Sequence, residues 1–269
     1  MKTAMKYQWM TMIRSKWLIS FGVLFTILAA ILVGSSGNES FSGFARSTAA
    51  LLNLSLLLIP LVTLLTGSLF LSGEKEDGRL ALLLTYPIST RALIGGLYIG
   101  SFLSLLTVIS FGYGGASIVL FLIGGGWSSF FFLSFFLTVL LAGIFLAISM
   151  FIGLYTSNRL QAIGVSLLIW AFFVLFYEFF IVGILSMVPK GWVLPLFALS
   201  IIMNPVELVR VWTITAMKSG TIFGPQLYEW TKWAESMNGQ FVFFGVACIW
   251  MVIPLIFANF LIKRGNRDA

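Results

Sequence analysis

The chain has 269 residues, of which 59% are hydrophobic and only 9% are charged. Soluble domains carry roughly a quarter charged residues, so this composition predicts a polytopic, all-α membrane protein in a single domain, 1–269. The net charge of +7 lies in short clusters beside apolar segments, which argues against a nucleic-acid partner. The absence of histidine excludes Ser/His/Asp and Cys/His catalytic sites, and the single cysteine excludes an intrachain disulfide.

Residues 1–16 predict an interfacial helix, because apolar side chains recur at helical spacing on one face and basic side chains lie among them. Lys2 and Lys6 fall near the apolar face and reach the headgroups by snorkelling. An alternative is a signal peptide with 17–33 as its core, but both the leading segment and the apolar core are longer than usual. The expected apolar face consists of Met5, Trp9, Met12 and Ile13.

Six apolar windows of about 20 residues are long enough to cross a bilayer. An even number of spans places both termini on the same side. With that side cytoplasmic, eleven of the sixteen basic residues face inward, as the positive-inside rule requires. The windows are 17–33, 49–72, 92–123, 129–155, 162–188 and 241–262. The inward basic residues are Lys2, Lys6, Arg14, Lys16, Lys75, Arg79, Arg91, Arg159, Lys263, Arg264 and Arg267.

Residues 73–91 form the most distinctive stretch, GEKEDGRLALLLTYPISTR, between the second and third windows. Burying its charges in lipid is expensive, so the stretch must lie in water. The apolar run at 80–84 has no use in a free loop, but it suits a short helix pressed against another protein, with charges that set the register. The residues expected to make this contact are Glu74, Glu76, Asp77, Arg79, Leu82, Leu83, Tyr86 and Pro87.

The short helix in this stretch is predicted to end near Thr85. Pro87 disfavours helical geometry at the preceding residue and cannot donate a hydrogen bond to the preceding turn. Ser89 or Thr90 is then placed to cap the next helix.

A resemblance to a known family rests on Gly73, Glu74, Glu76, Gly78, Leu80, the LLLTYP string at 82–87 and Gly96. In these residues the chain resembles the coupling segment of permease subunits in the type-2 export class of ABC transporters, and within it the NosY-type permeases of nitrous oxide reductase maturation. The resemblance implies a multi-pass protein of the prokaryotic plasma membrane whose coupling segment docks on a cytoplasmic ATPase. It also implies a second permease copy, with ATP and Mg on the ATPase and no cofactor in this chain.

Glu178 interrupts the fifth window, next to Tyr177 and without lysine or arginine in the same window. A buried, unpaired carboxylate is costly. We therefore expect Glu178 to be protonated, hydrogen-bonded to a hydroxyl of a neighbouring helix, or open to a water-filled cavity. The two residues form either a cargo contact or gate, or only a structural hydrogen bond.

Residues 189–240 predict two short extracytoplasmic helices on the membrane surface or on a partner. The first begins with asparagine at the cap, proline at the first helical position and glutamate at the third. The second follows Pro225, and its expected apolar face is Leu227, Trp230, Trp233, Ala234 and Met237. The NosY-type permeases resemble the chain here too, and they imply an extracytoplasmic partner for Asn204, Pro205, Glu207, Arg210 and Trp212.

These features favour a permease subunit over an enzyme. No glycine-rich loop ends in lysine followed by serine or threonine, so ATP must be bound by another subunit. The NosY-type resemblance implies export of a sulfur species, or mechanical coupling to an outer partner, during copper-enzyme maturation. The alternatives are a general exporter of an apolar peptide, antibiotic or lipid, and a membrane anchor or receptor that transports nothing. A membrane anchor or receptor would not explain the acidic, leucine-rich segment at 73–91.

Overall fold

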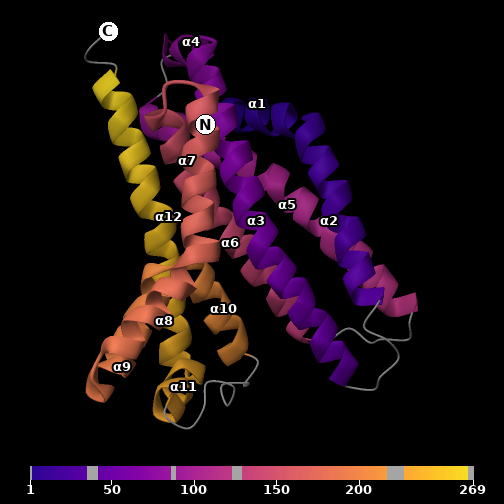
Figure 1. The fold of residues 1–269 in the computed structure, drawn as a ribbon. Coiled ribbons are helices and arrows are strands. Elements are labelled where there is room, and N and C mark those ends of the chain that lie inside the picture. The colour runs from indigo at the N-terminus through magenta and orange to yellow at the C-terminus, as the bar shows by residue number, and fades with distance from the viewer. Residues whose placement is uncertain (1, 35–41, 86–88, 123–128, 217–226, 266–269) are drawn as a thin grey trace.

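The computed structural model describes residues 2–34, 42–85, 89–122, 129–216 and 227–265. Every regular element in these ranges is helical, as the composition predicts (Figure 1). The elements are α1 (Lys2–Ile13), α2 (Lys16–Gly34), α3 (Ser42–Glu76), α4 (Arg79–Thr85), α5 (Thr90–Leu122), α6 (Ser129–Tyr155), α7 (Arg159–Ala171), the π-helix η1 (Phe172–Phe176), α8 (Tyr177–Met187), α9 (Lys190–Met203), α10 (Pro205–Ala216), α11 (Tyr228–Glu235) and α12 (Met237–Gly265).

Six helical runs in the described chain are long and apolar enough to cross a membrane, and they correspond to the six predicted windows. The fifth run is composed of α7, η1 and α8, so a π-helical segment lies in its middle. The runs are Lys16–Gly34, Thr48–Glu76, Thr90–Leu122, Phe131–Tyr155, Arg159–Met187 and Met237–Lys263.

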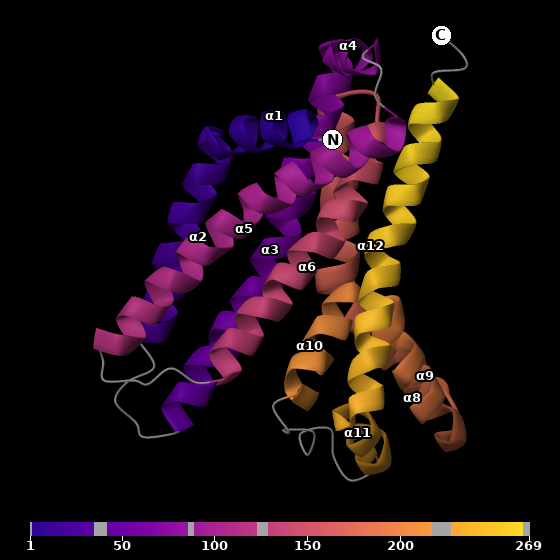
Figure 2. The ribbon, with the colours of Figure 1, turned by 180° about the vertical axis from the view of Figure 1, so that it is seen from behind.

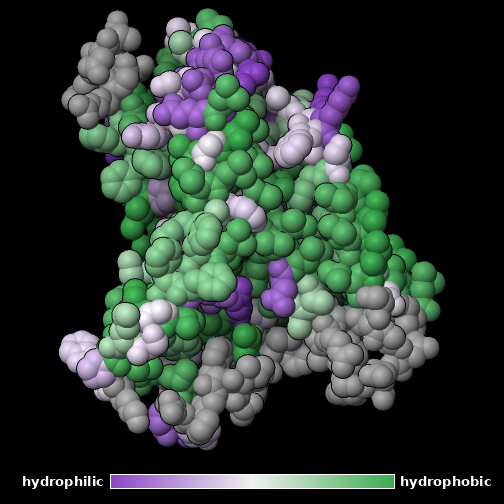
Figure 3. Space-filling model, viewed as in Figure 1, coloured by the Kyte–Doolittle hydropathy of each residue, from purple (hydrophilic) through white to green (hydrophobic). Residues whose placement is uncertain are grey.

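The bundle has two distinct ends. α1, α4, the start of α7 and the end of α12 gather at one end, while α9 and α11 lie at the other (Figures 1 and 2). Hydrophilic side chains concentrate at the α4 end, and hydrophobic ones cover the face below it (Figure 3). Both ends of the described chain therefore lie on the same side of the bundle as the predicted coupling segment.

Helices α3 and α6 form the centre of the bundle and pack closely through small residues. A side chain at Gly153 of α6 would lie 2.8 Å from Leu71 Cβ and 2.9 Å from the Ser68 carbonyl oxygen of α3. Another small residue, Gly67, faces Ser149. The hydrophobic effect does not drive spans together in lipid, so van der Waals packing at such closely approaching backbones is an important stabiliser of helix association.

Helix α1 lies across the α4 end and packs against α5. Its predicted apolar face is rotated from the buried one, since Trp9 and Ile13 are exposed. Gln8 is fully buried and donates from Nε2 to Ser101 Oγ at 2.7 Å. Gly100 of α5 leaves room for it, because a Cβ there would lie 2.7 Å from the Gln8 Cβ. A partner on α5 thus buries a residue that hydropathy alone places outside. The buried side chains are Ala4, Gln8 and Met12.

The segment 189–240 differs most from its prediction. Helix α9, which the sequence analysis missed, meets α10 at a bend of 111°, and together they form a broken span or a re-entrant loop by length and composition. Helix α10 is not on the surface, because it packs into the same core cluster as α6. Its apolar residues occupy more than one face, which suits burial rather than an interface. The buried residues are Pro205, Val206, Leu208, Val209, Val211, Trp212, Thr213 and Thr215.

The predicted second helix is present as α11, but only part of its predicted apolar face is covered: Ala234 is buried and Trp230 is half-buried. Thr231 and Ala234 are buried, whereas Trp233 and Met237 are exposed. A Cβ at Gly239 would lie 2.6 Å from the Ala234 Cα, so α11 meets the start of α12 at small residues. Ala234 and the partly buried Trp230, whose ring lies 5.5 Å from that of Phe197, therefore mark the covered face, whereas Trp233 stays exposed.

Candidate functional site

The predicted coupling segment consists of the end of α3, a tight turn and α4. Gly78 in the turn has a φ of +74°, the left-handed conformation that glycine adopts without strain, and its N–H donates to the Lys75 carbonyl at 3.2 Å. Glycine suits this turn because it has no Cβ to make the left-handed conformation costly.

The start of α5 is confirmed. Helix α4 is described as far as Thr85, so its predicted end near that residue stays a prediction. The Ser89 hydroxyl accepts a hydrogen bond from the Ala92 N–H at 3.3 Å and so caps α5. Tyr86 and Pro87, which are predicted to belong to the contact surface, lie outside the described residues.

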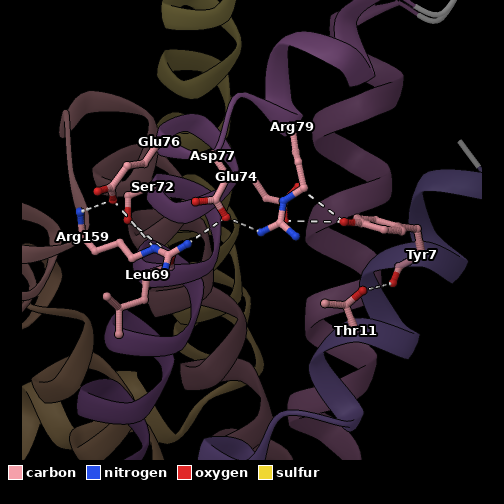
Figure 4. A network of polar contacts seen from close by, with 9 residues as sticks. All are labelled: Tyr7, Thr11, Leu69, Ser72, Glu74, Glu76, Asp77, Arg79 and Arg159. Carbon is pink, nitrogen blue, oxygen red and sulfur yellow. Dashed lines mark hydrogen bonds and ion pairs between the residues drawn. The ribbon is translucent and has the colours of Figure 1, made fainter.

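The acids of the segment are held within the protein and do not all extend into water. The Glu74 carboxylate is only 3% exposed, and it lies 3.1 Å from the Arg79 guanidinium (Figure 4). The Tyr7 hydroxyl donates to Glu74 at 3.4 and 3.5 Å. Burial, and then the charge of Glu74, raise the pKa of Tyr7. Glu74 thereby connects α3 to α4 and to α1.

Arg159, at the start of α7, completes the network. Its guanidinium lies 2.8 Å from Asp77 Oδ2, and its backbone N–H donates to Glu76 Oε2 at 3.2 Å (Figure 4). Asp77 is also 2.6 Å from Arg79. From the sequence alone, Arg159 is only one of the basic residues that indicate the orientation in the membrane. A lone basic residue in the short turn between the fourth and fifth windows was the signal for its second role.

Two further contacts fix this network to the bundle. Lys75 Nζ donates to the carbonyls of Leu154 and Thr156, both at 3.0 Å, at the end of α6. The Arg159 guanidinium lies against Gly73, where a Cβ would be 2.8 Å from its Nε. The turn between α3 and α4 and the residues beside it are therefore connected to α1, α6 and α7.

The leucines of α4 divide into inner and outer residues. Leu80 is buried against the bundle, and Leu83 is half-buried. Leu82 is 64% exposed at the hydrophilic end of the molecule. A large exposed apolar side chain on a charged, internally braced helix is suited to contact with another protein.

A second charged cluster joins α8 to α10. Arg210 forms ion pairs with Glu178 and with Glu207, the latter at 3.1 Å. The expectation that Glu178 is unpaired is therefore wrong. Its partner comes from a helix 32 positions later, outside the window in which a basic residue was sought. A small hydrophilic patch interrupts the hydrophobic surface where α8 meets α10 (Figure 3).

The N-cap predicted at Asn204 is confirmed, because its Oδ1 accepts from the Val206 N–H at 2.8 Å. Its Nδ2 also donates to the Phe173 carbonyl in η1 at 2.8 Å. The Tyr177 hydroxyl donates to the Ser200 carbonyl at 2.7 Å. Within the described part of the chain, Glu207 pairs with Arg210 instead of making the reciprocal capping bond. These contacts bind the bend between α9 and α10 to the π-helical part of the fifth span.

The fold and the two clusters define a class: a helical membrane protein in which ion pairs and hydrogen bonds hold the charged turn between the second and third spans. Residues 4–266 match the family model described as ABC-2 family transporter protein, and the chain belongs to that family. It is 27% identical over 225 residues to the probable ABC transporter permease protein NosY of Stutzerimonas stutzeri, and 28% identical over 226 residues to that of Pseudomonas aeruginosa. Each match covers 79% of this chain and 80% of the relative. The chain is thus a permease subunit of an ABC transporter, which implies an ATPase partner subunit.

Proposed function

We propose that this chain is a NosY-like permease that couples a separate cytoplasmic ATPase, which holds ATP and Mg, to work across a prokaryotic plasma membrane. The observation that carries the proposal is α4, where exposed Leu82 stands on a helix whose Arg79 pairs with Glu74 of α3 and with Asp77 of the turn. These two acids are in turn held by a hydrogen bond from Tyr7 of α1 and by an ion pair with Arg159 of α7. A free loop could move without moving the spans when a partner displaces it, whereas a helix bonded to its neighbours transmits the displacement to the spans. The α4 end is then cytoplasmic, and both termini lie on that side.

The task proposed for the transporter is copper-enzyme maturation, either by export of a sulfur species or by mechanical coupling to an extracytoplasmic partner. The relatives named NosY support this assignment. Because Arg210 and Trp212 pack within the chain, their proposed role is to transmit movement from α8 and η1 to the outer end rather than to touch the partner directly.

A second candidate, export of an apolar cargo, is favoured by the fifth span. Only 6% of its most apolar window is buried within the chain. Phe176, Phe179 and Phe180 are among its exposed aromatic side chains. A second copy of the permease that covers this face is part of either proposal, and Glu178 with Tyr177 would then border the path between the copies.

Leu82→Glu tests the docking surface without disturbing the brace. Full burial of a leucine contributes about 1.5–3 kcal/mol, so the change should weaken ATPase docking by roughly 10- to 100-fold. The measurement is recovery of a P-loop ATPase with the tagged permease in mild detergent, with its identity established by mass spectrometry.

The matched control is Leu122→Glu, since Leu122 is 77% exposed at the other end of the bundle. It should insert and recover the ATPase normally. Equal ATPase recovery by the two variants would exclude α4 as the docking surface.

A further inference from the structure

A groove of about 420 Å³ runs between α2 and α5, which lie side by side in Figure 2. Its floor contains Leu18 and Val108, both buried. Its rims are apolar side chains that are at least half exposed: Ile19, Val23, Ile27 and Phe111. The volume lies within the range of about 300–1,000 Å³ that small-molecule sites occupy.

The two hydroxyl groups that line the groove do not make it polar. Thr26 donates to the Gly22 carbonyl, and Thr107 donates to the Ser104 carbonyl, each at 2.7 Å and each within its own helix. Their donors are satisfied, so the groove offers an apolar ligand no unpaired donor. From Leu18 to Ile27, α2 rises about 14 Å. This length is close to one leaflet of a hydrocarbon core, about 15 Å.

The groove begins at a basic corner. Ile13 lines its upper end, directly before Arg14 and Lys16, which are exposed at the junction of α1 and α2. Within the described ranges neither cation forms an ion pair. The first turn of α2 adds backbone N–H groups without intrahelical acceptors, which favour an anion at this position. Trp17 beside them is 56% exposed, as is common at headgroup depth.

We propose that this groove and corner form a binding site for an anionic phospholipid. One acyl chain lies along α2 and α5, and the phosphate is held by Arg14, Lys16 and the start of α2. A soluble anion would not need the apolar groove, and an uncharged lipid would not use the two cations. Only an amphiphile with a negatively charged headgroup contacts both the apolar groove and the basic corner. The proposal does not depend on which cargo is exported, and the lipid site does not overlap the α4 surface proposed to dock the ATPase.

The site also has a structural consequence. The bound lipid would fix the corner at which α1 leaves the bundle, and α1 carries Tyr7, which bonds Glu74 in the coupling network. An anionic lipid at this corner thereby helps to hold Tyr7 against Glu74 and so adds to the bracing of α4.

The test is native mass spectrometry of the purified full chain titrated with phosphatidylglycerol or phosphatidylcholine. The wild-type protein should bind one phosphatidylglycerol at least tenfold more tightly than phosphatidylcholine. Arg14→Gln with Lys16→Gln should reduce phosphatidylglycerol binding by roughly 30-fold, since it removes two juxtamembrane cations, and leave phosphatidylcholine binding unchanged.

The matched control, Lys2→Gln with Lys6→Gln, removes the same charge from α1 away from the groove and should keep the preference. Thr107→Phe, which fills the groove, should weaken both lipids, whereas Thr107→Ser should weaken neither. If the two double variants lose the preference equally, or if Thr107→Phe binds lipid as the wild-type protein does, the proposal is wrong.

Discussion

Replacing Arg210 by glutamate tests the ion-pair cluster between α8 and α10. The change removes the cation shared by Glu178 and Glu207 and brings three carboxylates together. The Glu207 side chain is 16% exposed and that of Arg210 is 31% exposed, so this pair is largely withdrawn from water. Breaking a buried pair costs about 3–5 kcal/mol, and the residual exposure favours the lower end. Glu178, at 48% exposed, adds at most about 1 kcal/mol.

A loss of about 3 kcal/mol corresponds to a Tm lower by roughly 6–12 °C in a chain of this size. Thermal unfolding of the detergent-purified protein, followed by tryptophan fluorescence, measures the change. Adding Glu178→Arg to Arg210→Glu restores a cation at the same place and should recover at least half of the loss. Lys232→Glu, the same charge change on an exposed residue of α11, should shift Tm little.

The surface-helix interpretation of α10 expects no loss of stability from Arg210→Glu. A Tm equal to that of the Lys232→Glu control, or a double variant no more stable than Arg210→Glu alone, would refute the role of the cluster in holding α8 to α10.

Two further predictions concern the α4 end. A cysteine at Ser89 should be shielded from an impermeant thiol reagent in intact cells and one at Ser219 labelled, in a cysteine-free background; the reverse pattern would overturn the orientation. Gly73→Ala gains about 1 kcal/mol of helix propensity, but the new Cβ displaces the Arg159 guanidinium from its half-exposed ion pairs with Glu76 and Asp77. Because the two pairs together stabilise the protein by a similar amount, Tm should stay nearly constant while ATPase recovery falls. Gly95→Ala, where nothing lies within 4 Å of the new Cβ, should raise Tm through the same gain in helix propensity and leave ATPase recovery unchanged. Equal ATPase recovery by the two variants would contradict the bracing role.

The sequence by itself determined the features that depend on neighbouring residues. The six spans follow from apolar length, because lipid requires each crossing segment to satisfy its own backbone. The caps at Ser89 and Asn204 follow from side chains within three positions of the helix boundary. Such signals act before any tertiary contact forms, so they can be recognised in the sequence.

Only the tertiary structure decided which side chains meet across helices. The pair between Asp77 and Arg159 and the pair between Glu178 and Arg210 join residues 82 and 32 positions apart. No periodicity links such positions, and a charge searched for within one window cannot reveal a partner on another helix. The burial of Gln8 depended likewise on a hydroxyl and a glycine of α5. Burial of a polar group is set by the partner that satisfies it, and that partner is available only once the chain has folded.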